Sequence, residues 1–564
     1  MRGRTVLVVT FIVAAAVGVV TAARPPAPES ERNLSRLDLL PRSRGCTQAA
    51  TPTGLPGGSQ GFRAEPPRFA DPARRQTLAG AFVEIDRVVR DYAVRAHIPG
   101  AAWGLVIDGE LAHLGVAGTR EVGKEAPVDG DTVFRIASMT KSFTAMAILS
   151  LRDEGRLSLD DPAERYVPEL RGLAYPTEDA PRLTVRHLLS HAAGLPEDNP
   201  WGDQQLSATE EQLSALLRGG IPFSNSPGVA YEYSNLGFAI LGRIVVRVSG
   251  VSYREFVTAR ILRPLGMASS TLEPSEVPKG RLAHGYRWED ETWKEEPPLP
   301  DGAFGSMGGM LTSVRDLSRY VGAFLDAWPP RNGAEKSPVR RSSLREMQQA
   351  WRWRPATVGL EGASGAPRLN AGGYGFGLGM SQTCQFDHVV AHSGGLPGFG
   401  SLMRWLPEYG VGFIAFGNRT YTGWGGVADQ VFAMLAKTGG LQPREVQPSP
   451  ALAAAHDAVS RLVVAWDAGL IRQIAAVNLF LDRSEERRRA DFEHLRAEVG
   501  TCRADGRFEV VENPLRGSWL LQCERGRVRA SVTLAPTMPP TVQYLEVHAV
   551  PASGEPPRRP TCGQ

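Results

Sequence analysis

The stretch Val133-Phe-Arg-Ile-Ala-Ser-Met-Thr-Lys-Ser-Phe-Thr-Ala-Met-Ala-Ile-Leu149 decides how this chain is interpreted. From Ser138 onward its apolar residues recur at helical spacing, which predicts a helix with residues available for burial. Ser138 and Lys141 are three residues apart, so they share one face at the start of that helix. A desolvated lysine amine can take the proton of a serine hydroxyl and make it a nucleophile. The stretch therefore predicts nucleophilic catalysis by Ser138.

Lysine is scarce in this chain, which makes its position informative. Of the 63 Lys and Arg residues, six are lysines: Lys124, Lys141, Lys279, Lys294, Lys336 and Lys437. The pattern Ser-x-x-Lys occurs once, at Ser138 and Lys141. Because four-residue patterns also arise by accident, the interpretation needs further motifs.

A second motif is Tyr231-Glu-Tyr-Ser-Asn235, followed by an apolar run. Tyr233 and Asn235 place a phenol and a carboxamide on one turn. We expect the phenol beside the Lys141 ammonium to have a lowered pKa and to serve as a general base, and the amide to hold the lysine and a substrate carbonyl. Tyr231 is a second candidate phenol, but the asparagine two residues after Tyr233 favours Tyr233.

A third motif, Asp387-His-Val-Val-Ala-His-Ser-Gly-Gly395, predicts a strand that ends in glycines. Gly394 and Gly395 would let a substrate backbone approach closely. A free N–H group here could join that of Ser138 in an oxyanion hole.

The three motifs, in this order, resemble the family of class C type serine β-lactamases, D-alanyl-D-alanine carboxypeptidases, D-aminopeptidases and related esterases. The resemblance covers roughly residues 73–440. It implies an α/β (α+β) fold of the β-lactamase/transpeptidase type, with an antiparallel sheet flanked by helices plus a helical region. It also implies a role for each motif residue: Ser138 as nucleophile, Lys141 and Tyr233 as the acid/base pair, and Asn235, His392, Gly394 and Gly395 as substrate-binding residues. No metal or cofactor is implied.

The third motif departs from the dedicated β-lactamases of this family. Those enzymes typically have Lys-Thr-Gly, whereas this chain has His392-Ser-Gly394, the form found in peptidases and esterases. The resemblance therefore favours a peptidase or esterase. A catalytically weak penicillin-binding protein that senses cell-wall fragments stays an alternative, because slow turnover leaves no mark in a sequence.

Two other patterns match functional motifs in sequence but are better explained by structural roles. Lys437-Thr-Gly439 follows an apolar-periodic helix over 424–436, so we interpret Gly439 as a helix C-cap. His187 and His191 have a spacing that can bind zinc on a helix. No glutamate follows His187 and no third ligand presents itself, so we expect a structural role for the pair.

The chain divides into five predicted segments. They are a signal peptide (1–23), a proline-rich flexible linker (24–72), the hydrolase domain (73–440), a second linker (441–450) and a small α+β accessory domain (451–564). In the hydrolase domain we expect strands over 101–107 and 111–116 to join strands near Val389, Leu402 and Val411. In the accessory domain we expect helix over 451–499, with Leu462, Trp466, Leu470 and Ile474 along one stripe, then strands near Phe508, Trp519, Val532 and Tyr544. Of five cysteines, Cys502 and Cys523 are the expected disulfide.

The beginning of the chain predicts export. Residues 1–23 combine a basic start, an apolar run and small residues at a cleavage site, as in a secretory signal. An uncleaved N-terminal anchor is the alternative. We expect a periplasmic or extracellular protein whose substrate is a small molecule or a peptidoglycan-like compound. A net charge of +3 argues against nucleic acid as a partner.

Overall fold

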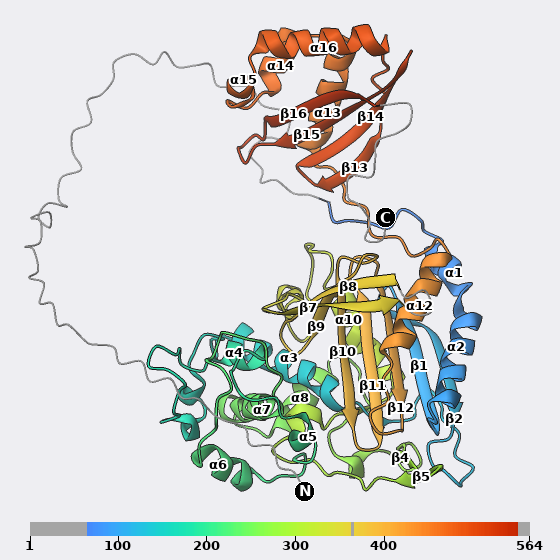
Figure 1. The fold of residues 1–564 in the computed structure, drawn as a ribbon, viewed down its shortest axis with the longest axis vertical. Coiled ribbons are helices and arrows are strands. Elements are labelled where there is room, and N and C mark those ends of the chain that lie inside the picture. Colours follow the sequence, from blue (N-terminus) through green and yellow to red (C-terminus); the bar gives the residue numbers. More distant parts are fainter. Residues whose placement is uncertain (1–64, 362–365, 551–564) are drawn as a thin grey trace, which may run out of the picture. The chain divides into compact units, whose positions relative to one another are not determined.

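The computed structural model describes residues 65–361 and 366–550, with side chains of 359–368 excluded (Figure 1). The predicted signal peptide, nearly all of the first linker, Cys46 and Cys562 lie outside the described residues.

An antiparallel sheet of eight strands, in the order β2-β1-β12-β11-β10-β9-β8-β7, forms the centre of the hydrolase domain (Figure 1). The strands are β1 (Gly100–Ile107), β2 (Glu110–Gly118), β7 (Arg352–Glu361), β8 (Ala366–Tyr374), β9 (Gly379–Gln382), β10 (Val389–Leu396), β11 (Phe399–Leu406) and β12 (Val411–Gly417). The predicted turn joins β1 to β2, and Asp108 and Gly109 both have positive φ, as a tight hairpin turn requires. As predicted, strands from both ends of the domain share the sheet, with Trp103 opposite Ala415.

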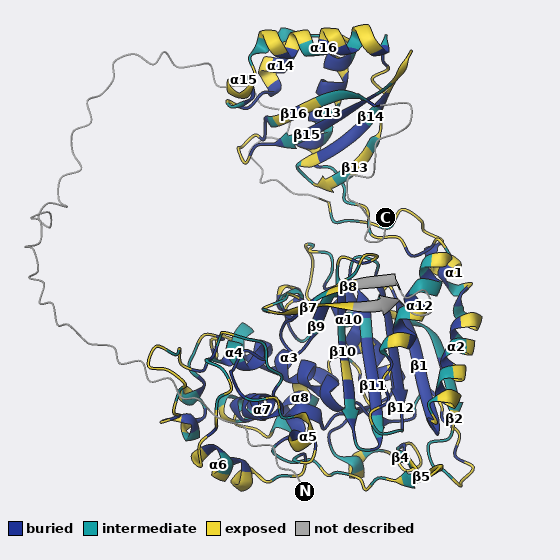
Figure 2. Cartoon of the chain, viewed as in Figure 1, coloured by how far each residue is buried: buried dark blue, intermediate teal, exposed yellow. Residues whose placement is uncertain are grey.

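Both faces of the sheet are covered at β1 and β12, which are buried along their whole length (Figure 2). Side chains alternate between the faces. On one face Trp103 and Phe413 pack in a cluster with α1 (Arg74–Ala79), α2 (Phe82–Arg95) and α12 (Gly425–Lys437). On the other face Val106 and Ile414 join a larger cluster that includes the helices α3 (Thr140–Asp153) and α10 (Val314–Asp326).

The helical region is inserted between β2 and β7. Its helices are α3 (Thr140–Asp153), α4 (Val185–Leu189), α5 (Asn199–Gly202), α6 (Glu210–Arg218), α7 (Asn235–Ser249), α8 (Tyr253–Val257), α9 (Gly305–Gly308), α10 (Val314–Asp326) and α11 (Arg341–Met347). Short helical turns are η1 (Ala137–Met139), η2 (Ala163–Arg165), η3 (Pro168–Leu170), η4 (Thr258–Leu262) and η5 (Pro274–Glu276). Two small sheets pair β3 (Phe134–Arg135) with β6 (Leu311–Thr312) and β4 (Tyr286–Glu289) with β5 (Thr292–Glu295).

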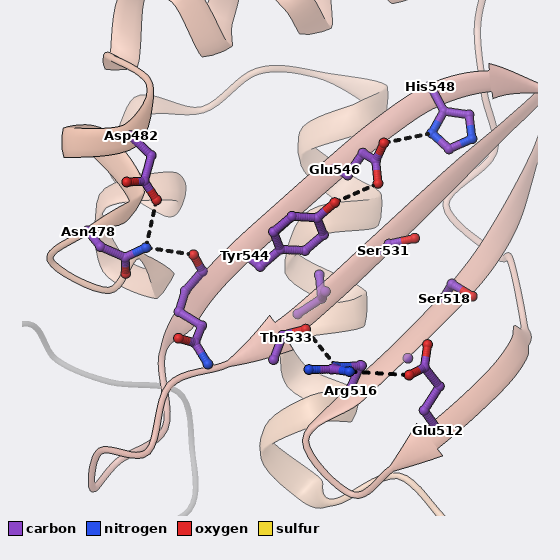
Figure 3. A pocket seen from close by; sticks show the side chains of 13 residues that line it. Asn478, Asp482, Glu512, Arg516, Ser518, Ser531, Thr533, Tyr544, Glu546 and His548 are labelled. Carbon is purple, nitrogen blue, oxygen red and sulfur yellow. Dashed lines mark hydrogen bonds and ion pairs between the residues drawn. The ribbon is translucent and has the colours of Figure 1, made fainter. Parts of the chain in front are cut away.

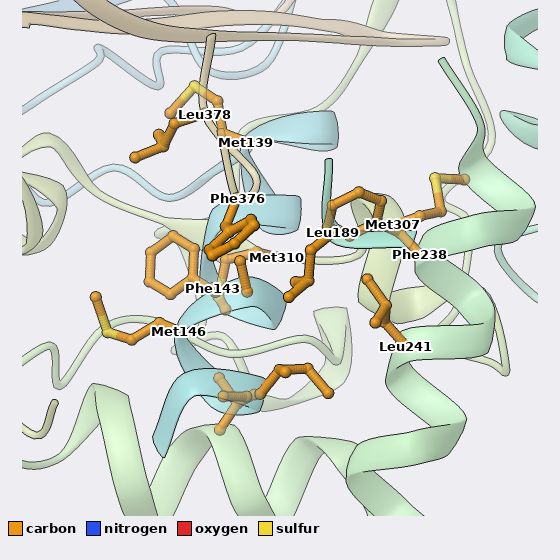
Figure 4. Close-up of a cluster of buried hydrophobic side chains, with 14 of the residues drawn as sticks. Met139, Phe143, Met146, Leu189, Phe238, Leu241, Met307, Met310, Phe376 and Leu378 are labelled. Atoms are coloured by element: carbon orange, nitrogen blue, oxygen red, sulfur yellow. The ribbon is translucent and has the colours of Figure 1, made fainter. Parts of the chain in front are cut away.

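Helix α3 lies inside this region. Every residue from Thr140 to Leu151 is buried, and Phe143 and Met146 pack among side chains of neighbouring segments, Phe238 among them (Figure 4). The buried hydroxyls of α3 are satisfied locally, as where Ser142 Oγ donates to the Met139 carbonyl at 2.8 Å. The helix is thus a rigid and dry support for its first turn.

Within the described residues no single helix is long and apolar enough to cross a membrane. Helix α7 and the α8–η4 segment pass that test only together, and they are bent by 77° relative to each other. Helix α7 is itself largely buried in the domain core.

The accessory domain has its own hydrophobic core. Its elements are α13 (Pro450–Val464), α14 (Ala468–Ile474), α15 (Leu479–Asp482), α16 (Glu485–Val499), β13 (Phe508–Asn513), β14 (Arg516–Cys523), β15 (Gly526–Leu534) and β16 (Val542–Val550). The four strands form an antiparallel sheet in sequence order. A disulfide joins Cys502 to Cys523, as predicted.

The helical part of the accessory domain differs from the expected single stripe. The chain leaves the helix after Val464, so Trp466 lies between two helices, and Asp467 Oδ1 accepts hydrogen bonds from the first N–H groups of α14. An aspartate that caps a new helix is the physical reason for the break. A polar groove of about 880 Å³ crosses this domain's sheet, with Arg516, Tyr544 and Glu546 among its lining residues (Figure 3).

Candidate active site

The predicted nucleophile and base lie together at the start of α3. Ser138 is in the turn η1 and Lys141 in the first turn of α3, and Lys141 Nζ is 3.0 Å from Ser138 Oγ. Lys141 is completely buried, whereas Ser138 keeps 8% of its surface exposed. A substrate can therefore reach the hydroxyl but not the amine behind it.

The partners of Lys141 suit a neutral amine. Nζ donates to Asn235 Oδ1 at 2.6 Å and to the Met307 carbonyl at 2.9 Å, and both atoms can only accept. These two bonds use both hydrogens of an –NH₂ group and leave its lone pair for the Ser138 hydroxyl. Burial lowers the pKa of Lys141 to about 7, against the opposing charges of Asp203 and Asp198. Near neutral pH a large share of Lys141 is thus the neutral amine that can take a proton.

Tyr233 differs from the sequence-based expectation in its acidity. Its hydroxyl is hydrogen-bonded to the Ser138 side chain, but desolvation raises the pKa of the phenol well above its usual value instead of lowering it. The expected lowering fails because burial dominates, and Lys141, whose Nζ lies over the ring 4.8 Å from its centre, is not among the groups that shift the pKa of Tyr233. Lys141 is itself desolvated, with a pKa of about 7, so only part of it is charged near neutral pH. Tyr233 is therefore a protonated phenol, fit to donate a proton and not to remove one.

Tyr231, the other candidate phenol, has different neighbours. Its ring centre is 5.7 Å from that of Tyr374 and 5.8 Å from the Arg354 guanidinium carbon. Burial raises the pKa of Tyr231, and Ser138 is not among the groups that shift it. The hydrogen bond to Ser138 thus distinguishes Tyr233 from Tyr231.

Replacing each tyrosine by phenylalanine should separate their roles. Tyr233→Phe removes the hydroxyl that contacts Ser138, so kcat should fall by about 10²–10⁴-fold, the usual contribution of a general acid or base. Tyr231→Phe should change kcat by less than about fivefold on the same scale. Steady-state hydrolysis of a p-nitrophenyl ester measures both. Equal losses in the two variants would contradict the assignment.

The start of α7 holds Asn235 in place. The Asp198 carboxylate accepts hydrogen bonds from the N–H groups of Asn235 at 2.6 Å and Leu236 at 2.8 Å, which caps the helix. Asn235 Nδ2 donates to Asn199 Oδ1 at 3.2 Å, so its Oδ1 is the atom that faces Lys141. Sequence reasoning missed Asp198 and Asn199, because nothing local marks a cap that lies 37 residues from the helix it serves.

His392 is brought to the site by β10 as a neutral side chain. Its Nδ1 is 2.6 Å from the Ser393 carbonyl, which can only accept, so Nδ1 carries the proton. Nε2 then accepts a hydrogen bond from the Tyr374 hydroxyl at 2.9 Å. Burial and the nearby Lys141 lower the pKa of His392 to about 3. The third motif thus presents no cation at His392. Tyr374, on β8, was not predicted.

Gly394 allows β10 to approach the nucleophile turn. A Cβ atom at this position would lie 2.0 Å from the Ile136 carbonyl oxygen, which also accepts a hydrogen bond from Ser401 Oγ at 2.8 Å. No flexible side chain could give way, since the obstacle is backbone. Gly395 follows on the same strand and belongs to the predicted oxyanion hole.

Gly394→Ala should therefore displace the nucleophile turn. We expect kcat/KM to fall by about 10²-fold, the cost of an ångström-scale misplacement, and the free energy of unfolding to fall by about 1–3 kcal/mol. Gly423→Ala is the matched control, because a Cβ atom there meets nothing within 4 Å. Thermal unfolding and ester hydrolysis measure the two effects. A Gly394→Ala protein indistinguishable from the control would contradict the packing argument.

The other two patterns do not supply the reacting groups, although His191 packs against the site. Lys437 is exposed at the end of α12, and Gly439 has the positive φ of a helix-ending glycine. His187 belongs to a capping box with Thr184 at the start of α4. His191 Nδ1 accepts a hydrogen bond from the Ser234 N–H at 3.1 Å, beneath Tyr233. The residues that the structure describes contain no group of three possible metal ligands.

Comparison with known proteins agrees with this arrangement. The family model described as Beta-lactamase matches residues 85–437, well over half of the chain. The chain belongs to the beta-lactamase family. A curated relative, Protein flp of Staphylococcus aureus (strain COL), is 28% identical over 337 residues, which cover 59% of this chain and 62% of that protein. The match thus spans less than two thirds of that relative's length.

Solved structures show the same fold for this beta-lactamase family member. An octameric penicillin-binding protein homologue from Pyrococcus abyssi is 22% identical, with a TM-score of 0.50 over 80% of this chain and 96% of that one. A class C beta-lactamase is 21% identical, with a TM-score of 0.50 over 66% of this chain and 100% of that one. These similarities establish the predicted fold of the hydrolase domain.

Proposed function

We propose that this protein is an exported serine hydrolase that cleaves an amide or an ester through an acyl-enzyme on Ser138. The observation that carries the proposal is the hydrogen-bond set of Lys141. Two fixed acceptors take its hydrogens, and burial lowers its pKa to about 7, so its lone pair is directed at Ser138 Oγ.

Acylation begins with proton transfer. Lys141 Nζ takes the hydroxyl proton while Ser138 Oγ forms a bond to the substrate carbonyl carbon. The carbonyl oxygen becomes an anion, and the N–H groups of Ser138 and Gly395 are the proposed oxyanion hole. Asn235, the residue expected to orient the substrate, is buried and uses its amide to hold Lys141 and to bond Asn199, so its role here is to position the amine.

Collapse of the tetrahedral anion needs an acid. The Tyr233 phenol, protonated because desolvation raises its pKa, gives its proton to the leaving nitrogen or oxygen as that atom's bond to the carbonyl carbon breaks. The proton held by Lys141 then restores the phenol. In deacylation a water molecule attacks the ester, its proton passes to Lys141, and Ser138 recovers a proton as the acid leaves.

The third motif supports a peptidase or esterase over a dedicated β-lactamase. His392 stands where those enzymes carry a lysine, and both of its ring nitrogens are already hydrogen-bonded. Export is supported by the character of residues 1–23.

Labelling and turnover measured in parallel test the proposal. Wild type and Ser138→Ala are treated with a fluorescent penicillin, and each is assayed with a p-nitrophenyl ester and a chromogenic cephalosporin. We expect ester turnover that depends on Ser138 and little cephalosporin turnover. Stable labelling without turnover would favour a penicillin-binding sensor, and rapid cephalosporin hydrolysis would favour a β-lactamase.

A further inference from the structure

The sheet of the accessory domain carries a groove that has no part in the reaction described above. The groove has a volume of about 880 Å³ and is lined by side chains from β14, β15 and β16 (Figure 3). This volume is in the range of sites that bind small molecules. One face of the sheet packs into the domain core through Trp519, Val528 and Val532. Because side chains alternate along a strand, the groove lies on the opposite face.

The strand register explains why this face is hollowed. Residues that are paired across neighbouring strands form rows on one face of a sheet. One row runs from Ser518 through Ser531 to Glu546, and the row beside it passes through Thr533 to Tyr544. The two serines have short side chains and are buried, so they form the floor. The longer side chains of Glu546 and Tyr544 rise beside them.

The polar side chains of the groove hold one another in place. The Tyr544 hydroxyl donates to Glu546 Oε2 at 2.7 Å, and Arg516 Nε donates to Thr533 Oγ1 at 3.1 Å. At the end formed by α15, the Asn478 amide makes two hydrogen bonds of 2.9 Å. Side chains that are already ordered lose less conformational entropy when a ligand binds. The groove is therefore prepared for a ligand with many hydrogen-bonding groups.

The charge of the groove restricts which ligands it can take. Its lining includes three carboxylates and one guanidinium, which are Asp482, Glu512, Glu546 and Arg516. The guanidinium lies 3.4 Å from Glu512, so it is already paired. The excess of carboxylates repels nucleic acids and other anionic polymers. The carboxylates at Asp482 and Glu546 accept hydrogen bonds from Asn478 and Tyr544, which holds them as acceptors at the edge of the groove.

Tyr544 adds an aromatic surface to these polar groups. Its hydroxyl is bonded to Glu546, yet half of the residue's surface is exposed, so its ring is accessible from the groove (Figure 3). The face of an aromatic ring carries partial negative charge and attracts C–H groups that are laid on it. A ligand that fits the groove thus has both an apolar C–H face and many hydroxyl groups.

From this groove we infer that the accessory domain binds a neutral carbohydrate chain. Sugar hydroxyls both donate and accept hydrogen bonds, as the serine and threonine hydroxyls of the groove do, and they donate to its carboxylates. The C–H face of a sugar ring matches Tyr544. Because the groove crosses three strands, it suits a chain of sugars more than a single ring. The inference uses no residue of the hydrolase domain and does not depend on the proposed reaction.

Titration with neutral hexasaccharides tests the inference. Full-length protein is titrated with chitohexaose, cellohexaose and laminarihexaose by isothermal calorimetry. We expect at least one of them to bind with a Kd of about 1 mM or lower. Hyaluronan hexasaccharide, which is anionic, should bind about tenfold more weakly or not at all. Hexalysine serves as the probe for a cationic peptide.

Substitutions in the groove show where the sugar binds. Tyr544→Ala removes the aromatic surface and should raise Kd about tenfold, whereas Tyr544→Phe keeps the ring and should stay within about threefold. Ser518→Gln fills the floor of the groove and should weaken binding as well. Trp353→Ala is the matched control, because it removes an exposed aromatic residue from the hydrolase domain, and it should leave Kd unchanged. The unfolding temperature of each variant verifies that it is folded.

The outcomes separate this inference from the proposed function. Failure of all three neutral sugars to bind would overturn it. Tighter binding of hyaluronan or of hexalysine than of any neutral sugar would overturn it too, and the latter would make the groove a site for cationic peptides. A Kd that neither Tyr544→Ala nor Ser518→Gln changes would show that the sugar binds elsewhere. Ester hydrolysis that depends on Ser138 should be the same in wild type and Tyr544→Ala, and its absence from both would contradict the hydrolase and not the sugar site.

Discussion

Replacing Ser138 by alanine is expected to reduce kcat/KM for ester and amide hydrolysis by a factor on the order of 10⁴ or more, because the nucleophile is lost while the rest of the site stays. The stability of the folded protein should change little. Ser138 contributes one hydroxyl, and Lys141 keeps its hydrogen bonds to Asn235 and Met307. The unfolding temperature should therefore stay close to that of wild type.

Ser142→Ala is the matched control for this variant. Ser142 lies on the same helix, is equally a buried serine, and accepts a hydrogen bond from the Tyr320 hydroxyl at 2.9 Å. Because Ser142 also donates to the Met139 carbonyl and its loss leaves the buried Tyr320 hydroxyl without this acceptor, stability should fall by about 1–3 kcal/mol, while hydrolysis should stay intact. Hydrolysis lost in Ser142→Ala but kept in Ser138→Ala would contradict the assignment of the nucleophile.

Replacing Lys141 by methionine should have the second largest effect. The side chain keeps a similar length but cannot take the Ser138 proton, so kcat should fall by about 10²–10⁴-fold. In wild type, kcat/KM should rise with pH through about 7, as the buried amine loses its proton. The pH–rate profile of the residual activity in Lys141→Met should lack this step. An unchanged profile would show that another group supplies the base.

The same substitution should alter how stability depends on pH. The pKa of Lys141 falls from 10.5 to about 7 on folding, so between these values the unfolded chain binds a proton that the folded chain does not. Stability from this group therefore rises with pH across that window, by up to about 1.4 kcal/mol per pH unit, and is constant below it. Relative to Lys141→Met, wild type should be least stable below pH 7 and should recover toward pH 10. Denaturant unfolding at several pH values measures the difference, and parallel curves for the two proteins would contradict a buried neutral lysine.

Local signals predicted the parts of the fold that depend on neighbours in sequence. The β1–β2 hairpin follows from alternating apolar residues around Asp108-Gly109, and the nucleophile turn follows from the spacing of Ser138 and Lys141. That β1 and β12, about 300 residues apart, share one sheet was expected because the motif order resembled a known family, whereas their direct pairing is a finding of the structure. The predicted strand around His392 and the predicted helix before Lys437 also identified His392, and not Lys437, as the residue of the third motif.

The features that sequence reasoning missed depend on tertiary contacts. Asp198 and Tyr374 are ordinary polar residues in the sequence, and each gains its role from a partner on another element. The acidity of Tyr233 was predicted with the wrong sign because burial, which no local pattern reports, outweighs the charge of a neighbouring amine.

The central claim, an acyl-enzyme on Ser138, is tested most directly by trapping it. Wild-type protein is acid-quenched during turnover of p-nitrophenyl butyrate, weighed intact by mass spectrometry and then mapped by peptide sequencing. The account predicts one butyryl group per chain, located on Ser138 and absent from the Ser138→Ala protein. A butyryl group on another residue, or undiminished turnover by Ser138→Ala, would contradict it.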